Sequence, residues 1–150
     1  LGLVRWREHS ARLIDDYGHH PTEVAVTLKA ARDAFAATRV VMVYQPHRFT
    51  RTRDHFDEFV SVLSENQVLI LLDVYAAGES PIDGADSQAL ANAIRSRGVL
   101  DPIVVSDQRH LAAVLTSILE DGDILLMQGA GDIGRLSTAL AECETLEVLL

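Results

Sequence analysis

The sequence predicts an α/β fold with a mostly parallel sheet of about six strands and with helices on both faces. Short apolar runs alternate along the chain with stretches that have helical spacing. The runs are continuous, with no regular apolar–polar alternation, and strands that are covered on both faces have this pattern. The composition agrees, because 48% of the 150 residues are hydrophobic and only 23% are charged, as in ordinary globular domains.

Five apolar runs are the predicted strands. The first is weak, since Arg12–Ile14 leads directly into a polar segment. The others are Arg39–Gln45, Val68–Val74, Ile103–Ser106 and Asp123–Gln128. Leu146–Leu150 is a candidate sixth strand. Residues 1–11 fit the pattern poorly, and we interpret them as a lead-in segment before one domain that spans residues 12–150.

Helices are predicted between these runs. Pro21 opens the first, with Glu23 in its first turn, which is a typical start signal. The remaining predicted helices are Thr52–Glu65, Ser87–Arg97, Gln108–Leu119 and Ile133–Ala141. In such a fold the carboxyl ends of the strands share one edge of the sheet, and ligands usually bind there.

Charge and cysteine content exclude several classes of function. The net charge is −9, which disfavours nucleic acid and anionic membranes as partners. Cys143 is the single cysteine, so no intramolecular disulfide is available and a reducing, cytoplasmic location is expected. The longest apolar run, Val68–Leu72, is far shorter than a membrane span.

A cluster of acids, a phenol and imidazoles follows the first predicted strand, over Asp15–Pro21 (DDYGHHP). An acid at this position can accept hydrogen bonds from a ribose. A histidine at a helix start can meet an anion or transfer a proton. The alternative is a plain turn with exposed histidines, and we favour the functional interpretation.

A basic cluster follows the next strand, in Gln45–Arg53 (QPHRFTRTR). Arg48 and Arg51 are three residues apart, which would place them on one face of a starting helix. Paired guanidiniums there would bind a carboxylate or a phosphate. The alternative is a solvated turn paired with Asp54, Asp57 or Glu58.

The segment Gly129–Gly134 (GAGDIG) matches the dinucleotide-binding fingerprint G-x-G-x-x-G. That fingerprint belongs to the first strand–helix turn of its fold, whereas here it follows the last strand. We therefore favour a tight turn that allows close helix–strand packing. No P-loop and no convincing metal-binding spacing occur in the sequence, so no metal site is predicted.

Taken together, the polar segments resemble the C-terminal domain of the Mur ligase family of peptidoglycan synthesis, in particular its alanine-adding members. The segments are DDYGHHPTEV (Asp15–Val24), QPHRFTRT (Gln45–Thr52), DVYAAGE (Asp73–Glu79) and QGAGDIG (Gln128–Gly134). They occur in the family's order. The resemblance implies a Rossmann-like, three-layer α/β domain.

The resemblance also implies an activity. An ATP-dependent ligase of this kind activates the carboxylate of UDP-N-acetylmuramate as an acyl phosphate, and the amine of L-alanine attacks it. ATP and Mg²⁺ would serve the full enzyme, with neither firmly bound by this domain alone. The P-loop and the UDP-sugar site would lie in other domains, so we expect the isolated fragment to be inactive. Cell wall biogenesis, cell shape and cell division are the implied processes.

Site roles follow from motif position. Asp16 would bind the ATP ribose, and His19 would lie beside the reacting phosphate and amino acid, so both are implied as catalytic and ATP-binding residues. The residues implied around L-alanine are Tyr17, His47, Arg48 and Arg51, with the arginines on its carboxylate. Tyr75, with Ala76 and Ala77, would narrow the pocket.

Three alternatives stay open. A murein peptide ligase would share the architecture and the first motif, although QPHRFTRT favours the alanine-adding members. A free-standing α/β domain could bind a small carboxylate or a nucleotide. The glycine motif leaves room for an NAD(P)-dependent oxidoreductase.

Overall fold

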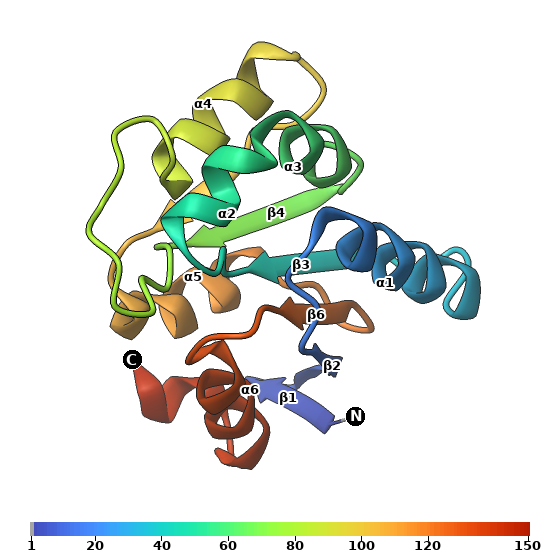
Figure 1. Cartoon of the computed structure of the whole chain (residues 1–150). Helices are drawn as coiled ribbons and strands as arrows, with labels where there is room; N and C mark the ends of the chain where they lie inside the picture. Colours follow the sequence, from blue (N-terminus) through green and yellow to red (C-terminus); the bar gives the residue numbers. More distant parts are fainter. Residues whose placement is uncertain (1) are drawn as a thin grey trace.

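A computed structural model describes residues 2–150, which form a three-layer α/β domain (Figure 1). Its sheet has six strands in the order β1-β2-β6-β3-β4-β5. The strands are β1 (Gly2–Trp6), β2 (His9–Asp16), β3 (Val40–Tyr44), β4 (Val68–Leu72), β5 (Ile103–Val105) and β6 (Ile124–Gln128). Every neighbouring pair is parallel except β1 and β2. The predicted fold class is confirmed.

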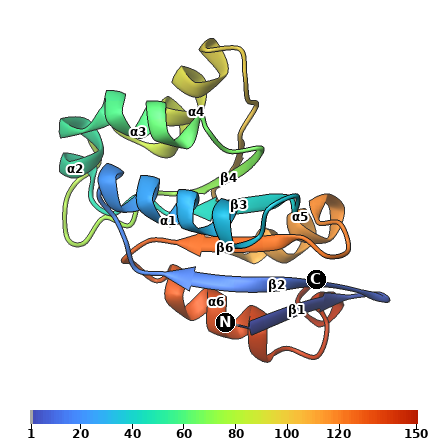
Figure 2. The same ribbon diagram turned by 90° about the vertical axis from the view of Figure 1, so that its right-hand side faces the viewer.

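Helices cover both faces of the sheet. They are α1 (Pro21–Ala34), α2 (Phe49–Asp54), α3 (Phe56–Leu63), α4 (Ser87–Ser96), α5 (Leu111–Ile118) and α6 (Ile133–Glu142), with 3₁₀ turns at Gln108–His110 and Leu146–Leu149. Figure 2 shows α1, α3 and α4 on one face and α5 and α6 on the other. No helix of residues 2–150 is long and apolar enough to cross a membrane.

The central strands explain why the apolar runs are continuous. In β3, Val41 and Val43 join the core cluster on the α5–α6 side, whereas Met42 and Tyr44 join the cluster under α1 and α3. Successive side chains of a strand point to opposite faces, so a strand between two helical layers buries every residue. Strand β6 is fully buried in the same way.

The N-terminal segment belongs to this sheet. Strand β1 pairs antiparallel with β2, from Gly2 opposite Leu13 to Trp6 opposite His9. Val4 and Trp6 are buried in the α5–α6 side of the core. Residues 2–11 are therefore integrated in the fold, where the sequence pattern indicated only a lead-in segment. Leu1 lies outside the described residues.

The predicted strand at Leu146–Leu150 is wrong, because the segment is a 3₁₀ turn. Only Leu146 is buried, and it packs into the α5–α6 side of the core. A single inward side chain anchors a turn but does not supply the repeated inward contacts that a strand uses. Strand β1 occupies that edge of the sheet instead.

The helix predicted over Thr52–Glu65 is divided in two at His55, whose φ of −119° and ψ of 27° leave the helical region. Helix α3 buries Phe59 and Leu63 against the sheet, while α2 begins earlier than predicted, at Phe49. Because of this break, α3 packs against the core, whereas α2 continues from the end of β3. Arg51 and its neighbours thereby lie at the edge of the sheet.

Candidate functional site

The carboxyl ends of four strands bring the predicted polar clusters together. In the parallel register, Asp16 of β2 and Tyr44 of β3 both lie opposite Gln128 of β6. Beyond β3 and β4, His47 and Tyr75 form an isolated bridge. The sequence-predicted site residues therefore lie along one edge of the sheet, at the end of β2 (Asp16), in the loops after β2 and β3, and in the first turn of α2 (Arg51).

Asp16 is held by hydrogen bonds to one of its carboxylate oxygens. Its Oδ2 accepts from the Gly18 backbone N–H at 3.0 Å, from Thr27 Oγ1 at 3.1 Å and from Gln128 Nε2 at 2.8 Å. Sequence spacing did not single out Thr27 or Gln128. Gln128 lies within a quoted motif, and Thr27 lies one helical turn after Glu23, but their contacts with Asp16 depend on the sheet register.

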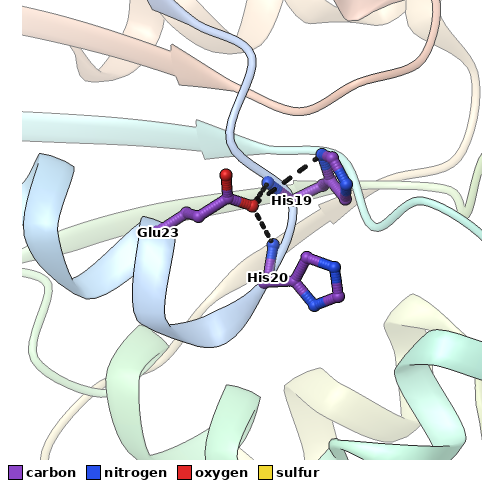
Figure 3. Close-up of side chains that lie close together, drawn as sticks. All are labelled: His19, His20 and Glu23. Atoms are coloured by element: carbon purple, nitrogen blue, oxygen red, sulfur yellow. Dashed lines mark hydrogen bonds and ion pairs between the residues drawn. The ribbon is translucent and has the colours of Figure 1, made fainter.

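Glu23 orders the turn that presents His19. Figure 3 shows it reaching back from the first turn of α1, where Oε1 accepts the backbone N–H groups of His19 at 3.1 Å and His20 at 3.0 Å. These bonds, that from His20 first, lower the pKa of the Glu23 carboxyl. His19 and His20 with Glu23 are metal-ligand types within 4.8 Å of one another, but the shared carboxylate oxygen serves as a helix cap.

Burial, together with the adjoining Arg51, favours the neutral form of His47. The guanidinium Nη1 donates to the His47 carbonyl at 3.0 Å and lies 2.9 Å from Nδ1 of the ring. Because arginine has no acceptor, Nδ1 must accept and the ring proton lies on Nε2. Burial, followed by the charge of Arg51, lowers the pKa of His47. His47 therefore offers an N–H donor at Nε2 at neutral pH.

An aromatic row connects the segments. The His47 ring stacks on Tyr75, with centroids 5.5 Å apart and planes inclined by 17°. The ring centroid of His19 lies 5.8 Å from that of His47, and the ring centroid of Tyr17 lies 6.1 Å from that of His19. Backbone bonds fix the Tyr75 end, since Arg48 N–H donates to Tyr75 O and Tyr75 N–H donates to Pro46 O, both at 2.8 Å.

Arg48 has an unusual backbone. It precedes α2 with φ of 74° and ψ of 138°, a region that residues with a side chain rarely adopt. Its side chain is exposed, and within residues 2–150 neither Arg48 nor Arg51 forms an ion pair with a carboxylate. The alternative in which the acids after Arg53 neutralise this pair is therefore not what the structure shows. Such retained strain is typical of functional positions.

Glu79 is a site residue whose role the sequence did not reveal. Its carboxylate accepts the Thr50 backbone N–H at 3.1 Å and the Thr50 hydroxyl at 2.5 Å. The hydroxyl bond is the main reason why the pKa of Glu79 is lowered. The contact ties the loop after β4 to the first turn of α2, so the segments of Tyr75 and Arg51 are fixed relative to each other.

The glycine motif is packed against neighbouring loops. A Cβ on Gly131 would lie 2.6 Å from Gln45 Oε1 and 2.6 Å from Tyr75 Cγ. Gln45 is buried, its Oε1 accepts the Ile133 N–H at 3.2 Å, and its Nε2 donates to Asp132 at 2.6 Å. The amide thus occupies the start of α6, where a dinucleotide phosphate would bind. A tight turn is confirmed, although Gly134 has no atom within 4 Å of its Cβ position.

Comparisons with known proteins agree on the family. The family of the Mur ligase, glutamate ligase domain, matches residues 3–131. UDP-N-acetylmuramate–alanine ligase of Thermotoga maritima is 25% identical, with a TM-score of 0.70 over 92% of this chain. Murein peptide ligase of Psychrobacter arcticus has 19% identity and a TM-score of 0.67 over 93% of the chain.

Folylpolyglutamate synthase of Mycobacterium tuberculosis, solved with ADP and AMPPCP, shares the fold at 16% identity, with a TM-score of 0.58 over 87% of this chain. The chain spans 27% of the Thermotoga ligase and 30% of each of the other two proteins. The family match covers most of the described residues. The chain therefore belongs to the Mur ligase family, as its glutamate ligase domain.

Proposed function

We propose that this chain is the C-terminal, amino-acid- and ATP-binding domain of an ATP-dependent ligase that joins L-alanine to UDP-N-acetylmuramate. The observation that carries the proposal is the pair Arg48 and Arg51, which has no carboxylate partner within residues 2–150 and adjoins His47 and Tyr75. Charge that the fold leaves uncompensated is suited to an anionic ligand. The similarity to the Thermotoga alanine ligase supports alanine as that ligand.

The arginines would bind the carboxylate of the amino acid. Arg51 is already oriented by its bonds to the His47 carbonyl and ring. Arg48 is exposed and available to a ligand from solvent. With its carboxylate held there, the amine of alanine would be directed away from the cations and toward the reacting carbonyl. The contribution of these residues is positioning, which can supply a large part of a bimolecular rate enhancement.

Tyr75 and His47 would form one wall of the amino-acid site. Their stacked rings present a flat surface beside the arginines, and Tyr75 is fixed by backbone bonds at both ends. Ala76 and Ala77 follow in the same loop. A wall held in this way would favour a small side chain. Tyr17, which is 71% exposed, would contact the ligand from the opposite end of the row.

His19 would lie beside the amine and the phosphate. Its Nδ1 lies 3.3 Å from the Tyr17 carbonyl, which places the proton of a neutral ring on Nδ1 and leaves Nε2 as an acceptor. A histidine in this form can accept a proton. We assign His19 this role beside the amino acid, together with contact to ATP.

Asp16 would bind the ribose of ATP. ATP, when bound with Mg²⁺, supplies the phosphoryl group that activates the muramate carboxylate. The free oxygen of the Asp16 carboxylate suits a hydroxyl donor, so the residues present fit a nucleotide. We place this chemistry in the cytoplasm, in peptidoglycan synthesis, with UDP-N-acetylmuramate held by other domains.

The test is a substrate panel with the ligase that contains this domain. ADP release would be measured with UDP-N-acetylmuramate and L-alanine, glycine or L-serine, and separately with a muropeptide-derived tripeptide. We expect the highest kcat/KM with L-alanine. Preference for the tripeptide would identify a murein peptide ligase. The lack of any ADP release, together with tight binding of another carboxylate by this domain, would favour a binding module.

A separate titration tests the oxidoreductase alternative. NADH fluorescence would be followed while this chain is added. We expect no saturable change, because Gln45 occupies the start of α6. A saturable signal would contradict the structural role that we assign to the glycine turn.

A further inference from the structure

The two oxygens of the Asp16 carboxylate have different surroundings. Oδ2 accepts three hydrogen bonds, from Gly18, Thr27 and Gln128, at 2.8–3.1 Å. Within the described residues, no hydrogen bond reaches Oδ1. A carboxylate oxygen has about two lone pairs, so Oδ2 has no remaining capacity, whereas Oδ1 can accept from a ligand. The carboxylate therefore presents one defined acceptor.

Gln128 donates from a fully buried position. Its side chain has 0% exposure, and its Nε2 lies 2.8 Å from Asp16 Oδ2. Turning the amide over would set its carbonyl oxygen against the carboxylate, so the carboxylate determines the orientation. The consequence is that Gln128 Oε1 is buried without a hydrogen-bond partner among the described residues. An unpaired buried acceptor destabilises a fold, and here it accompanies the bond that holds Asp16.

Thr27 and Gly18 complete the arrangement. Thr27 projects its hydroxyl from α1 to Asp16 at 3.1 Å, so the first helix is coupled to the end of β2. A Cβ on Gly18 would lie 2.9 Å from Asp16 Oδ2 and 2.7 Å from Gln128 Nε2. Only glycine fits the close approach of these groups. Three separate parts of the chain thus converge on a single oxygen.

We propose that Thr27 and Gln128 are positioning residues for nucleotide binding, which hold Asp16 Oδ2 so that Oδ1 faces the ribose hydroxyls. This inference rests on the proposed function, in which Asp16 binds ATP. The hollow beside Asp16 supports the placement. It has a volume of about 450 Å³ and is lined by Asp16 itself together with Tyr17, Val26 and Thr27 among others.

The test compares nucleotides in the ligase that contains this domain. We expect Thr27→Val and Gln128→Met each to raise the KM for ATP about tenfold with little change in kcat. Asp16 would lose a hydrogen bond that orients its carboxylate, so its charge-assisted bond to the ribose would weaken. The KM for L-alanine should stay the same. The preference for ATP over 2′,3′-dideoxy-ATP should shrink in both variants, and Thr27→Ser, which keeps the hydroxyl, should restore it.

Control variants separate structural from positioning effects. Thr116→Val removes a similar hydroxyl from α5, where it bonds only to the Ala113 carbonyl at 2.8 Å, and it should leave the nucleotide preference intact. In an Asp16→Ala background, Thr27→Val should add nothing further. Should Gln128→Met fail to fold, the half-exposed Thr27 still carries the comparison.

Two outcomes contradict different parts of the argument. Full nucleotide preference in Asp16→Ala would overturn the ribose role of Asp16, and with it this part of the proposed function. Loss of preference in Asp16→Ala, combined with full preference in Thr27→Val, would overturn only the positioning role. Thermal unfolding of each variant would show that the compared proteins are folded.

Discussion

The arginines near the amino ends of the strands and those near the carboxyl ends have opposite environments. Before β3, Arg39 forms ion pairs at 2.7 Å with both Asp123 and Glu120 and donates to the Ile118 carbonyl at 2.7 Å. At the opposite edge, Arg48 and Arg51 have no carboxylate partner within the described residues. The bond to Asp123 raises the pKa of Arg39 above its ordinary value. The compensated charge of Arg39 indicates a structural role, whereas the uncompensated charge of Arg48 and Arg51 suits the anionic ligand that we propose.

The largest expected effect on stability concerns Arg39, whose charge is compensated by carboxylates. Arg39→Met should lower the free energy of unfolding by about 3 kcal/mol, because Asp123, which is only 3% exposed, would keep a buried charge without its guanidinium. Urea denaturation of this chain measures the change. Arg109→Ala, which breaks an exposed pair with Asp107, is the control and should leave stability unchanged. Equal stability of Arg39→Met and wild type would show that the ion pairs of Arg39 do not stabilise the fold.

Arg48→Ala should have the reverse profile. In the ligase that contains this domain, we expect the KM for L-alanine to rise about thirtyfold, equivalent to about 2 kcal/mol, because a charge-assisted bond is lost. The KM for ATP and the stability should change little. Steady-state kinetics with each substrate varied in turn gives the answer, and unchanged alanine kinetics would show that Arg48 does not bind the carboxylate.

Arg48→Gly sharpens the same point. Glycine tolerates a φ of 74°, so this variant should unfold with a free energy about 1 kcal/mol higher than that of Arg48→Ala. Alanine binding should be lost equally in both. A difference in denaturation midpoint without a difference in KM would separate backbone strain from ligand contact, whereas equal stabilities would mean that the strain is absent.

The glycine motif provides a matched pair of variants. Gly131→Ala should cost about 1–2 kcal/mol, because its Cβ would clash with Gln45 and Tyr75. Gly134→Ala, which meets no atom within 4 Å, should be neutral or slightly stabilising in α6. Denaturation curves of the two variants test this. Similar costs at both positions would contradict the close packing of the turn.

The smallest expected effect is a pH dependence from His47. Its pKa lies below the ordinary value of about 6.5, so the folded state binds fewer protons than the unfolded state as pH falls through that range. Stability from this group is present above about pH 6.5 and declines as pH falls toward its folded pKa. NMR titration of the ring should place the midpoint below that of an exposed histidine.

The contact between Arg51 and His47 predicts how Arg51→Met changes the pKa of His47. Removing the guanidinium takes away a charge that lowers the pKa of His47, so its midpoint should rise. The loss of stability on acidification should shrink in parallel. An unchanged midpoint would mean that burial alone sets the pKa of His47.

Regular elements with strong local signals were predictable. The continuous apolar runs at β3, β4 and β6 identified buried parallel strands, because burial on both faces leaves a local signature. Segments with one or two inward residues were less clear. Val4 and Trp6 gave too little pattern to reveal β1, and Leu146 began a run that became a 3₁₀ turn. The sequence also did not predict the helix break at His55, because this break depends on the tertiary contacts of α2 and α3.

The sequence by itself determined the α/β class and indicated that the polar side chains after the strands would gather at one edge of the sheet, since strand ends and polar clusters are local features. Tertiary structure alone decided how those side chains are held. Gln128 meets Asp16 across 112 residues, and Gln45 meets Asp132 across 87. Contacts between strands depend on register, which local spacing does not encode.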